Sequence, residues 1–219
     1  MTDEEWATIE EFFVTYSQPG TIGRPAKWDK RDIVNAVFYV LATGCQWRAL
    51  AERYPHWNTV HRYHKSWSED GTWEAVAAHV VGRVREREGR EGQPSAGVID
   101  ARTVRGAATV CGSTRGYDAG KKISGRKVFG VVDTCGLLIA VAVVAAFGRF
   151  CRSVGIVASV VKRAKVKGFE PLPRRWVVER TWSWLMNHRR LQIDYERDPV
   201  TTEGFIWAAQ TRLALRNLT

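Results

Sequence analysis

Apolar residues change their spacing once along the chain, near residue 96. Before that point they recur every three or four residues, as on the buried face of an α-helix. After it they come in short runs that are typical of buried strands. The helical segments are 3–16, 29–43, 46–54, 59–69 and 73–87, and the strand segments are 98–100, 127–133 and 137–146. Helices followed by strands indicate an α+β protein.

Residues 86–96 separate the two patterns with a polar, glycine-bearing sequence that lacks apolar periodicity. Such a composition is typical of a linker. We therefore expect a helical domain over residues 1–85 and a second domain over residues 97–219. A chain of 219 residues with 45% hydrophobic content is long and apolar enough to bury a core.

The helices before the linker resemble a helix-turn-helix, with a tight turn at Pro55–Asn58 before the third helix. Asn58 is suited to cap that helix. Helical spacing directs Val60, Tyr63 and Trp67 to the core. The polar residues left outward are Asn58, His61, Arg62 and Lys65. Such side chains can bond phosphates and base edges in a major groove, although a plain helical bundle with a solvated polar face explains the same pattern.

Positive charge recurs along the chain, with 33 Lys and Arg against 23 Asp and Glu and a net charge of +10. A polyanion is the partner that this charge favours, with acidic membrane lipid as the rival. The segment 115–127, which leads into the strand at 127–133, contains glycines and five cations, and could lie along a sugar-phosphate backbone. Its candidate DNA contacts are Lys121, Lys122, Arg126 and Lys127. A solvated approach to a hairpin is the alternative interpretation.

Nothing in the sequence points to a membrane or to secretion. The longest apolar run, Leu137–Phe147, has 11 residues and is too short to span a bilayer. The first residues are acidic and lack an apolar signal region, so we expect a soluble, cytoplasmic protein. Cysteines fall singly, which argues against zinc ribbons and disulfide frameworks. His61 and His64 have a spacing that could serve a metal, but no cysteine or acid accompanies them.

Two acids stand in basic or aromatic surroundings. Asp100 closes a short apolar run that is typical of a buried strand. Glu179 lies in a helix-forming segment, 173–185, that is rich in Arg and Trp. With 3.6 residues per turn, Glu179 shares a face with Arg175 and Arg190. For this helix alone, a surface pair between Arg175 and Glu179, worth about 0.3 to 0.5 kcal/mol, is the simpler explanation.

The order of a strand ending in Asp, a hairpin and a later helix carrying Glu resembles that of the metal-binding acids in the ribonuclease H-like fold. Several stretches are similar to DDE-type transposases of bacterial insertion sequences: Thr43–Leu50, Asp70–Trp73, Gly116–Lys122, Val132–Leu138 and Leu172–Thr181. The resemblance implies cutting and joining of DNA at the ends of a mobile element, with Asp100 as the first catalytic acid and Glu179 as the third. It also implies that both acids ligate Mg²⁺, which favours oxygen ligands.

Arginines near Glu179 would hold DNA phosphate beside this site, because the guanidinium offers a fork of donors. They are Arg175, Arg180, Arg189 and Arg190. The expected partner is the double-stranded DNA of the element's terminal inverted repeats, a homo-oligomer is a further expectation, and Mg²⁺ is the expected cofactor.

The stretch that should carry the family's second acid is missing. Only 34 residues separate Val144 from Glu179, and residues 145–153 contain no Asp or Glu. Asp133, at the tip of the hairpin, and Glu170 are poor substitutes. We therefore expect a helix-turn-helix-like part followed by an incomplete ribonuclease H-like α/β domain, in a transposase copy that is inactive and binds Mg²⁺ weakly. The alternative is a catalytically dead DNA-binding remnant that competes with or represses transposition.

Overall fold

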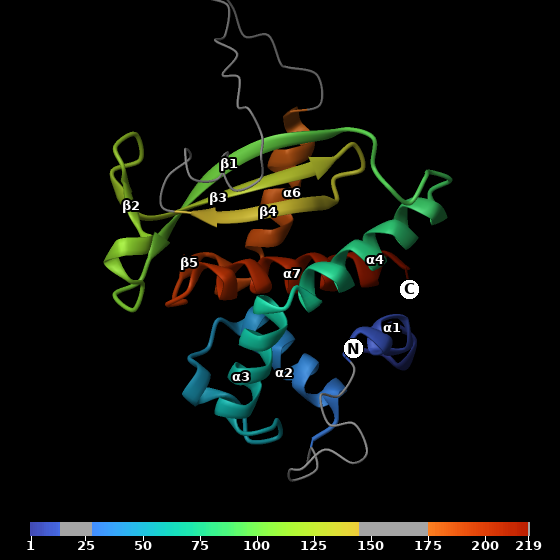
Figure 1. The fold of residues 1–219 in the computed structure, drawn as a ribbon, viewed down its shortest axis with the longest axis horizontal. Coiled ribbons are helices and arrows are strands. Elements are labelled where there is room, and N and C mark those ends of the chain that lie inside the picture. The colour runs from blue at the N-terminus through green and yellow to red at the C-terminus, as the bar shows by residue number, and fades with distance from the viewer. Residues whose placement is uncertain (14–27, 145–174, 219) are drawn as a thin grey trace, which may run out of the picture.

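The computed structural model describes residues 1–13, 28–144 and 175–218 and shows helices at the amino-terminal end followed by a mixed β-sheet with further helices (Figure 1). The α+β class expected from the change in apolar spacing is therefore confirmed. Among the described residues, no helix is both long and apolar enough to cross a membrane.

The amino-terminal helices follow the predicted apolar spacing closely. They are α1 (Asp3–Ile9), a 3₁₀ turn (Glu10–Phe13), α2 (Lys30–Thr43), a 3₁₀ turn (Trp47–Ala49), α3 (Trp57–Glu69) and α4 (Thr72–Arg87). Asp29 caps α2 by accepting a hydrogen bond from the Arg31 N–H at 2.9 Å. Gly44 ends α2 in the left-handed conformation, with φ at +68°, as expected for a glycine after a helix.

Two local predictions in this part are wrong. The helix expected over 46–54 is only the turn Trp47–Ala49, which buries none of its residues. A segment this short has no buried face to stabilise it as a helix. The cap of α3 is His56, whose Nδ1 accepts from the Asn58 N–H at 3.3 Å, so Asn58 already lies inside the helix.

The sheet contains β1 (Gly97–Gly106), β2 (Gly116–Asp118), β3 (Ile123–Asp133), β4 (Leu138–Val144) and β5 (Ile193–Asp194). Its order is β2-β3-β1-β5, with β4 also paired to β3. The predicted hairpin is β3–β4, and β1 runs antiparallel to β3. The short strand β5 was not predicted, and it pairs in parallel with the last two residues of β1.

The later helices are α6 (Arg175–Met186) and α7 (Pro199–Leu218), joined by a 3₁₀ turn (Arg189–Leu191) and β5. Figure 1 shows α7 between the sheet and the amino-terminal helices α2 and α3. Two of its side chains accept hydrogen bonds from the edge strand β4: Glu203 from the Val143 N–H at 2.7 Å and Gln210 from the Leu138 N–H at 3.3 Å. These bonds occupy strand-edge donors that would otherwise be free to pair with another chain.

One hydrophobic cluster runs through both parts of the chain. It joins Trp67 and Trp73 of the amino-terminal helices with Phe205 of α7 and Leu138 of β4. A buried ion pair between Arg85 of α4 and Asp133 also joins the helices to the β3–β4 turn. The division into domains at residues 86–96 stays a prediction.

Candidate functional site

Asp100 lies in the middle of β1, half-buried, directly opposite Gly130 of β3. Paired residues in antiparallel strands point to the same face of the sheet. A side chain at Gly130 would place its Cβ 2.7 Å from Cζ2 of Trp182, so α6 covers this face. The burial of the two faces agrees, since Val132 on the covered face is 0% exposed and Ile99 on the other face is 52% exposed.

Glu179 is exposed on α6, three residues before Trp182. Residues three apart are neighbours on a helix surface. Because Trp182 lies over Gly130, which faces Asp100, both predicted acids belong to the side of the sheet that α6 covers. Their joint role as metal ligands stays a prediction, and so does the pair of Arg175 with Glu179, because the Arg175 side chain lies outside the described part of the structure.

The surroundings of Asp100 do not fit a divalent cation. Within the described residues, no group of three or more His, Cys, Asp or Glu side chains could hold a metal ion. The buried polar atoms without a hydrogen-bond partner on this face are donors, namely Nε of Arg102 and Nε1 of Trp182. A magnesium ion needs oxygen ligands, and N–H donors cannot supply them.

Arg102 follows Asp100 by two residues on β1 and therefore points to the same face. Its side chain is half-buried. Burial lowers the pKa of Arg102 below its ordinary value, while the charge of Asp100 acts in the opposite direction. The side chain two positions from Asp100 on this face is therefore the positively charged Arg102.

Asp133, the first candidate to replace the missing acid, forms an ion pair and hydrogen bonds away from Asp100. It is fully buried and forms an ion pair with Arg85. Its Oδ1 also accepts from the backbone N–H groups of Cys135 at 2.9 Å and Leu137 at 2.8 Å. Asp133 lies three positions along β3 from Gly130, roughly 10 Å away, and this odd spacing points it to the opposite face from Asp100. Glu170, the second candidate, lies outside the described residues.

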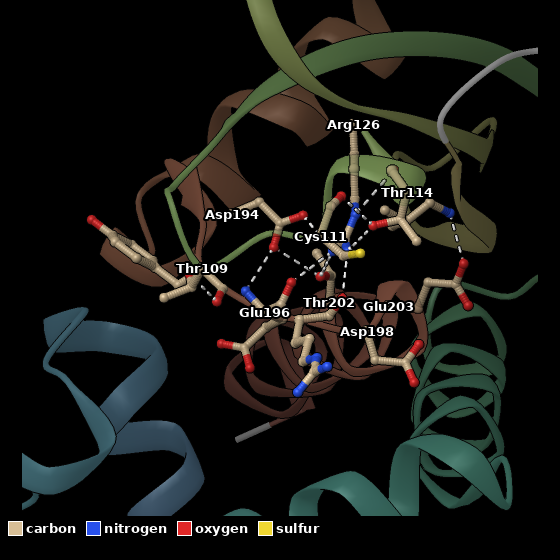
Figure 2. Close-up of polar contacts among 12 residues, drawn as sticks. Thr109, Cys111, Thr114, Arg126, Asp194, Glu196, Asp198, Thr202 and Glu203 are labelled. Atoms are coloured by element: carbon tan, nitrogen blue, oxygen red, sulfur yellow. Dashed lines mark hydrogen bonds and ion pairs between the residues drawn. The ribbon is translucent and has the colours of Figure 1, made fainter. Parts of the chain in front are cut away.

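Arg126 was predicted to contact DNA phosphate, and its environment contradicts this. Figure 2 shows its guanidinium among polar groups contributed by Thr114, Asp194 and Thr202. The ion pair with Asp194 measures 2.9 Å, and Nη2 donates to Thr114 Oγ1 at 2.7 Å. Since Arg126 is 0% exposed and its donors are used inside the protein, none is left for a phosphate.

Arg190 is likewise wrong as a phosphate contact. It is buried, pairs with Glu196, and donates from Nη1 to the Cys45 carbonyl at 3.1 Å. Its guanidinium lies 5.6 Å from the ring centre of Trp47. Arg190 thus ties the segment after α6 to the turn after α2. Its neighbour Arg189 is exposed, and its contact with phosphate stays a prediction.

The outward face of α3, which was predicted to contact phosphates and base edges of DNA, is only partly exposed. Asn58, Arg62 and Lys65 are exposed, and Lys65 pairs with Glu69 at 3.4 Å. His61 is half-buried with its ring edge-on to Trp47 at 5.1 Å, and burial lowers its pKa. It is therefore a weaker candidate for base contact than its neighbours on the helix.

His64 is a core residue and has no free nitrogen for a metal. Its Nδ1 accepts from Trp73 Nε1 at 3.1 Å, and its Nε2 donates to the Thr201 carbonyl at 3.3 Å. It is completely buried, which lowers its pKa to about 3. The metal interpretation of His61 and His64 is therefore wrong for the described structure.

The turn between β2 and β3 exposes Lys121 and Lys122. Asp118 holds this turn by accepting from the Lys121 N–H at 3.1 Å and from the Thr103 hydroxyl, and these hydrogen bonds lower the pKa of Asp118. Lys127 is part-exposed and lies 3.9 Å from Asp118. Lys122 has a φ of +54°, a conformation that favours glycine.

Two tryptophans on α6 flank the predicted phosphate contact Arg180. Trp176 is 59% exposed and Trp184 is 40% exposed. The Arg180 guanidinium lies 4.7 Å from the ring centre of Trp176 and 4.6 Å from that of Trp184. Its Nη2 donates to the Cys135 carbonyl at 3.0 Å, so only part of its donor set remains for DNA.

Sequence reasoning missed Arg102, Asp194 and Glu196. A signal existed for Arg102, because strand alternation alone places it on the face of Asp100. None existed for Asp194 or Glu196, because their partnerships depend on how distant segments pack: Arg126 and Asp194 are 68 residues apart.

Comparison with known protein families gives matches over nearly the whole chain. Residues 1–77 match a family described as transposases of the IS4/5 type (DUF4096). Residues 91–149 and residues 144–216 each match a family described as a transposase DDE domain. No curated protein and no solved structure matches the chain. With the α+β architecture, these family matches show that the chain belongs to the DDE-type transposases of insertion sequences.

Proposed function

We propose that this chain binds double-stranded DNA at the ends of an insertion sequence and is impaired in cutting and joining it. Membership of the family indicates transposition, with DNA as the partner. The proposed impairment is supported by the position of Asp133, the first candidate to replace the missing acid. Asp133 is buried, paired with Arg85 and directed to the face of the sheet opposite to Asp100.

DNA binding is supported by two groups of exposed cations. One is on α3, where Arg62 and Lys65 lie on the same side as Asn58, and the other is the β2–β3 turn with Lys121 and Lys122. Arg62, Lys121 and Lys122 have no ion pair with any described residue. We assign base reading to α3 and phosphate contact to the turn, and assembly of several copies on the two ends belongs to the same proposal.

Transposases with DDE domains generally use a divalent metal ion. In the complete family the second acid would come from the segment that is missing here, and the two DDE matches overlap at residues 144–149, between Val144 and Glu179. Since the residues around Asp100 do not fit a cation, we assign no step of cleavage to this chain.

The DNA-binding part is tested by fluorescence anisotropy with a duplex from the element's end and with a random duplex, each at two salt concentrations. We expect binding that weakens steeply with salt. Arg62→Ala should weaken the end duplex more than the random one, whereas Arg83→Ala, an exposed arginine on α4, serves as the charge-matched control. Binding without salt dependence, or equal losses for both variants, would contradict the assignment.

The cleavage part is tested by nicking of the same end duplex in Mg²⁺ or Mn²⁺, with Glu179→Gln as control. We expect no nicking above the level of Glu179→Gln. A chain that binds ends without cutting them would compete with an active copy, and this is tested by adding it to a cleavage assay of an intact transposase. Nicking that Glu179→Gln abolishes would show that another acid completes the site.

A further inference from the structure

Arg102 has an unusual place for a guanidinium. It lies on the face of the sheet that α6 covers, and its Nε is buried without a hydrogen-bond partner. Neither Arg102 nor Asp100 forms an ion pair within 4 Å in the described part of the chain. The two residues are two positions apart on β1, about 7 Å along one face.

The charge balance around Asp100 follows from this placement. Asp100 is half-buried, so part of its carboxylate is shielded from water and a nearby positive charge would stabilise it. Across the strand pair stands Gly130, which has no side chain, and over it lies the ring of Trp182. Within the described residues, Arg102 is therefore the cation of the chain that lies beside Asp100 on this face, and arginine keeps its charge at every pH at which proteins fold.

We infer that Arg102 replaces the metal ion as the positive charge beside Asp100. The fixed charge of Arg102 compensates the carboxylate of Asp100 and repels a divalent cation. This inference rests on the proposed function only in taking Asp100 as the acid that corresponds to the family's first metal ligand. It adds a second reason for impaired cleavage, independent of the missing acid. Restoring the missing second acid alone would then leave metal binding weak.

The test is calorimetric titration of the whole chain with Mn²⁺ alone. The unaltered chain should show no binding that depends on Asp100. Arg102→Gln should bind Mn²⁺ at least tenfold more tightly than the unaltered chain, and Asp100→Asn in the Arg102→Gln background should remove the gain. Arg105→Gln is the matched control, because Arg105 is an exposed arginine of the same strand on the other face. It removes the same charge and should leave Mn²⁺ binding unchanged.

Two results would overturn the inference: Asp100-dependent Mn²⁺ binding by the unaltered chain, or equal Mn²⁺ affinities for Arg102→Gln and Arg105→Gln. Thermal melting supplies a second readout. Asp100→Asn should shift the Tm differently in the unaltered chain and in the Arg102→Gln background, whereas equal shifts would mean that the two side chains are not coupled. If Arg102→Gln does not fold, Arg102→Met takes its place with the same expected outcomes, since it keeps the apolar stem.

Duplex binding separates this inference from the proposed function. Arg102→Gln should bind the end duplex as the unaltered chain does, because Arg102 is half-buried on the face of the sheet that α6 covers and is not among the proposed DNA contacts. Failure of the unaltered chain to bind DNA would refute the proposed function, while the Mn²⁺ titration would still decide the role of Arg102.

Discussion

Asp133→Asn decides whether Asp133 is a structural acid or a catalytic one. The substitution keeps the shape of the side chain and an oxygen that can accept from the N–H groups of Cys135 and Leu137. It removes the negative charge that faces Arg85. Both side chains of this pair are buried, with 0% of Asp133 and 7% of Arg85 exposed. Removing one partner of a buried pair costs about 3 to 5 kcal/mol, because the other charge stays buried without compensation.

We expect about 3 kcal/mol for Asp133→Asn, the lower end of that range, because both backbone hydrogen bonds survive. Asp133→Ala should cost more, since each buried N–H left without an acceptor adds about 1 to 3 kcal/mol. For a chain of this size a loss of 1 kcal/mol lowers the Tm by roughly 2 to 4 °C. Asp133→Asn should therefore lower the Tm by roughly 6 to 12 °C.

The assay is thermal and urea unfolding followed by circular dichroism. Glu69→Gln provides the control, because it breaks the exposed pair of Lys65 and Glu69 and should cost less than about 0.5 kcal/mol. A Tm that is unchanged or raised by Asp133→Asn would refute the structural role, because residues held for activity often reduce stability rather than support it.

The remaining predictions concern three other positions. The pKa of Glu203 is raised to about 6 from 4.5 by burial, so the folded state holds its proton more tightly than the unfolded one. This contribution to the free energy of unfolding, about 2 kcal/mol in all, is fully present below pH 4.5 and is lost as pH rises through 6. Because pH 5 already lies above 4.5, urea unfolding at pH 5 and pH 7.5 should show a fall of roughly 1 kcal/mol, which Glu203→Gln should abolish. Gly130→Ala should cost about 1 to 3 kcal/mol by pressing on Trp182, measured as a lower Tm with altered tryptophan fluorescence; an unchanged Tm would mean that α6 does not pack there. Lys122→Gly should raise stability by up to about 1 kcal/mol by relieving its positive φ and lower duplex affinity; unchanged affinity would exclude Lys122 as a phosphate contact.

Local spacing was enough to predict most elements and the general location of the acids. Helices α2, α3 and α4 and the β3–β4 hairpin appear where apolar periodicity and turn residues put them. Asp100 lies on a strand and Glu179 on a later helix as expected, but the strand does not end at Asp100 and continues to Gly106. The wrong elements are short ones: the segment 46–54 lacks a buried face, and the two-residue strand β5 exists only because it reaches the end of β1.

The roles of individual charges could not be predicted in the same way. Arg126 and Lys127 are adjacent in the sequence, yet one is 0% exposed and the other is part-exposed. Strand alternation separates them, and only the packing of α7 and of the segment around Asp194 shows which of the two faces is closed. Arg189 and Arg190 differ in the same way, because Glu196 and Trp47 enclose the second of them.

The sequence by itself determined the α+β class, the helices and strands with strong periodicity, the family, and the absence of an acid between residues 145 and 153. Tertiary structure decided which cations remain on the surface, that Asp133 is held by Arg85, and that α6 covers the face of Asp100 and Arg102. The physical reason is the range of each interaction. Periodicity reports contacts within a few residues, whereas burial of a charge depends on partners that folding brings from distant parts of the chain.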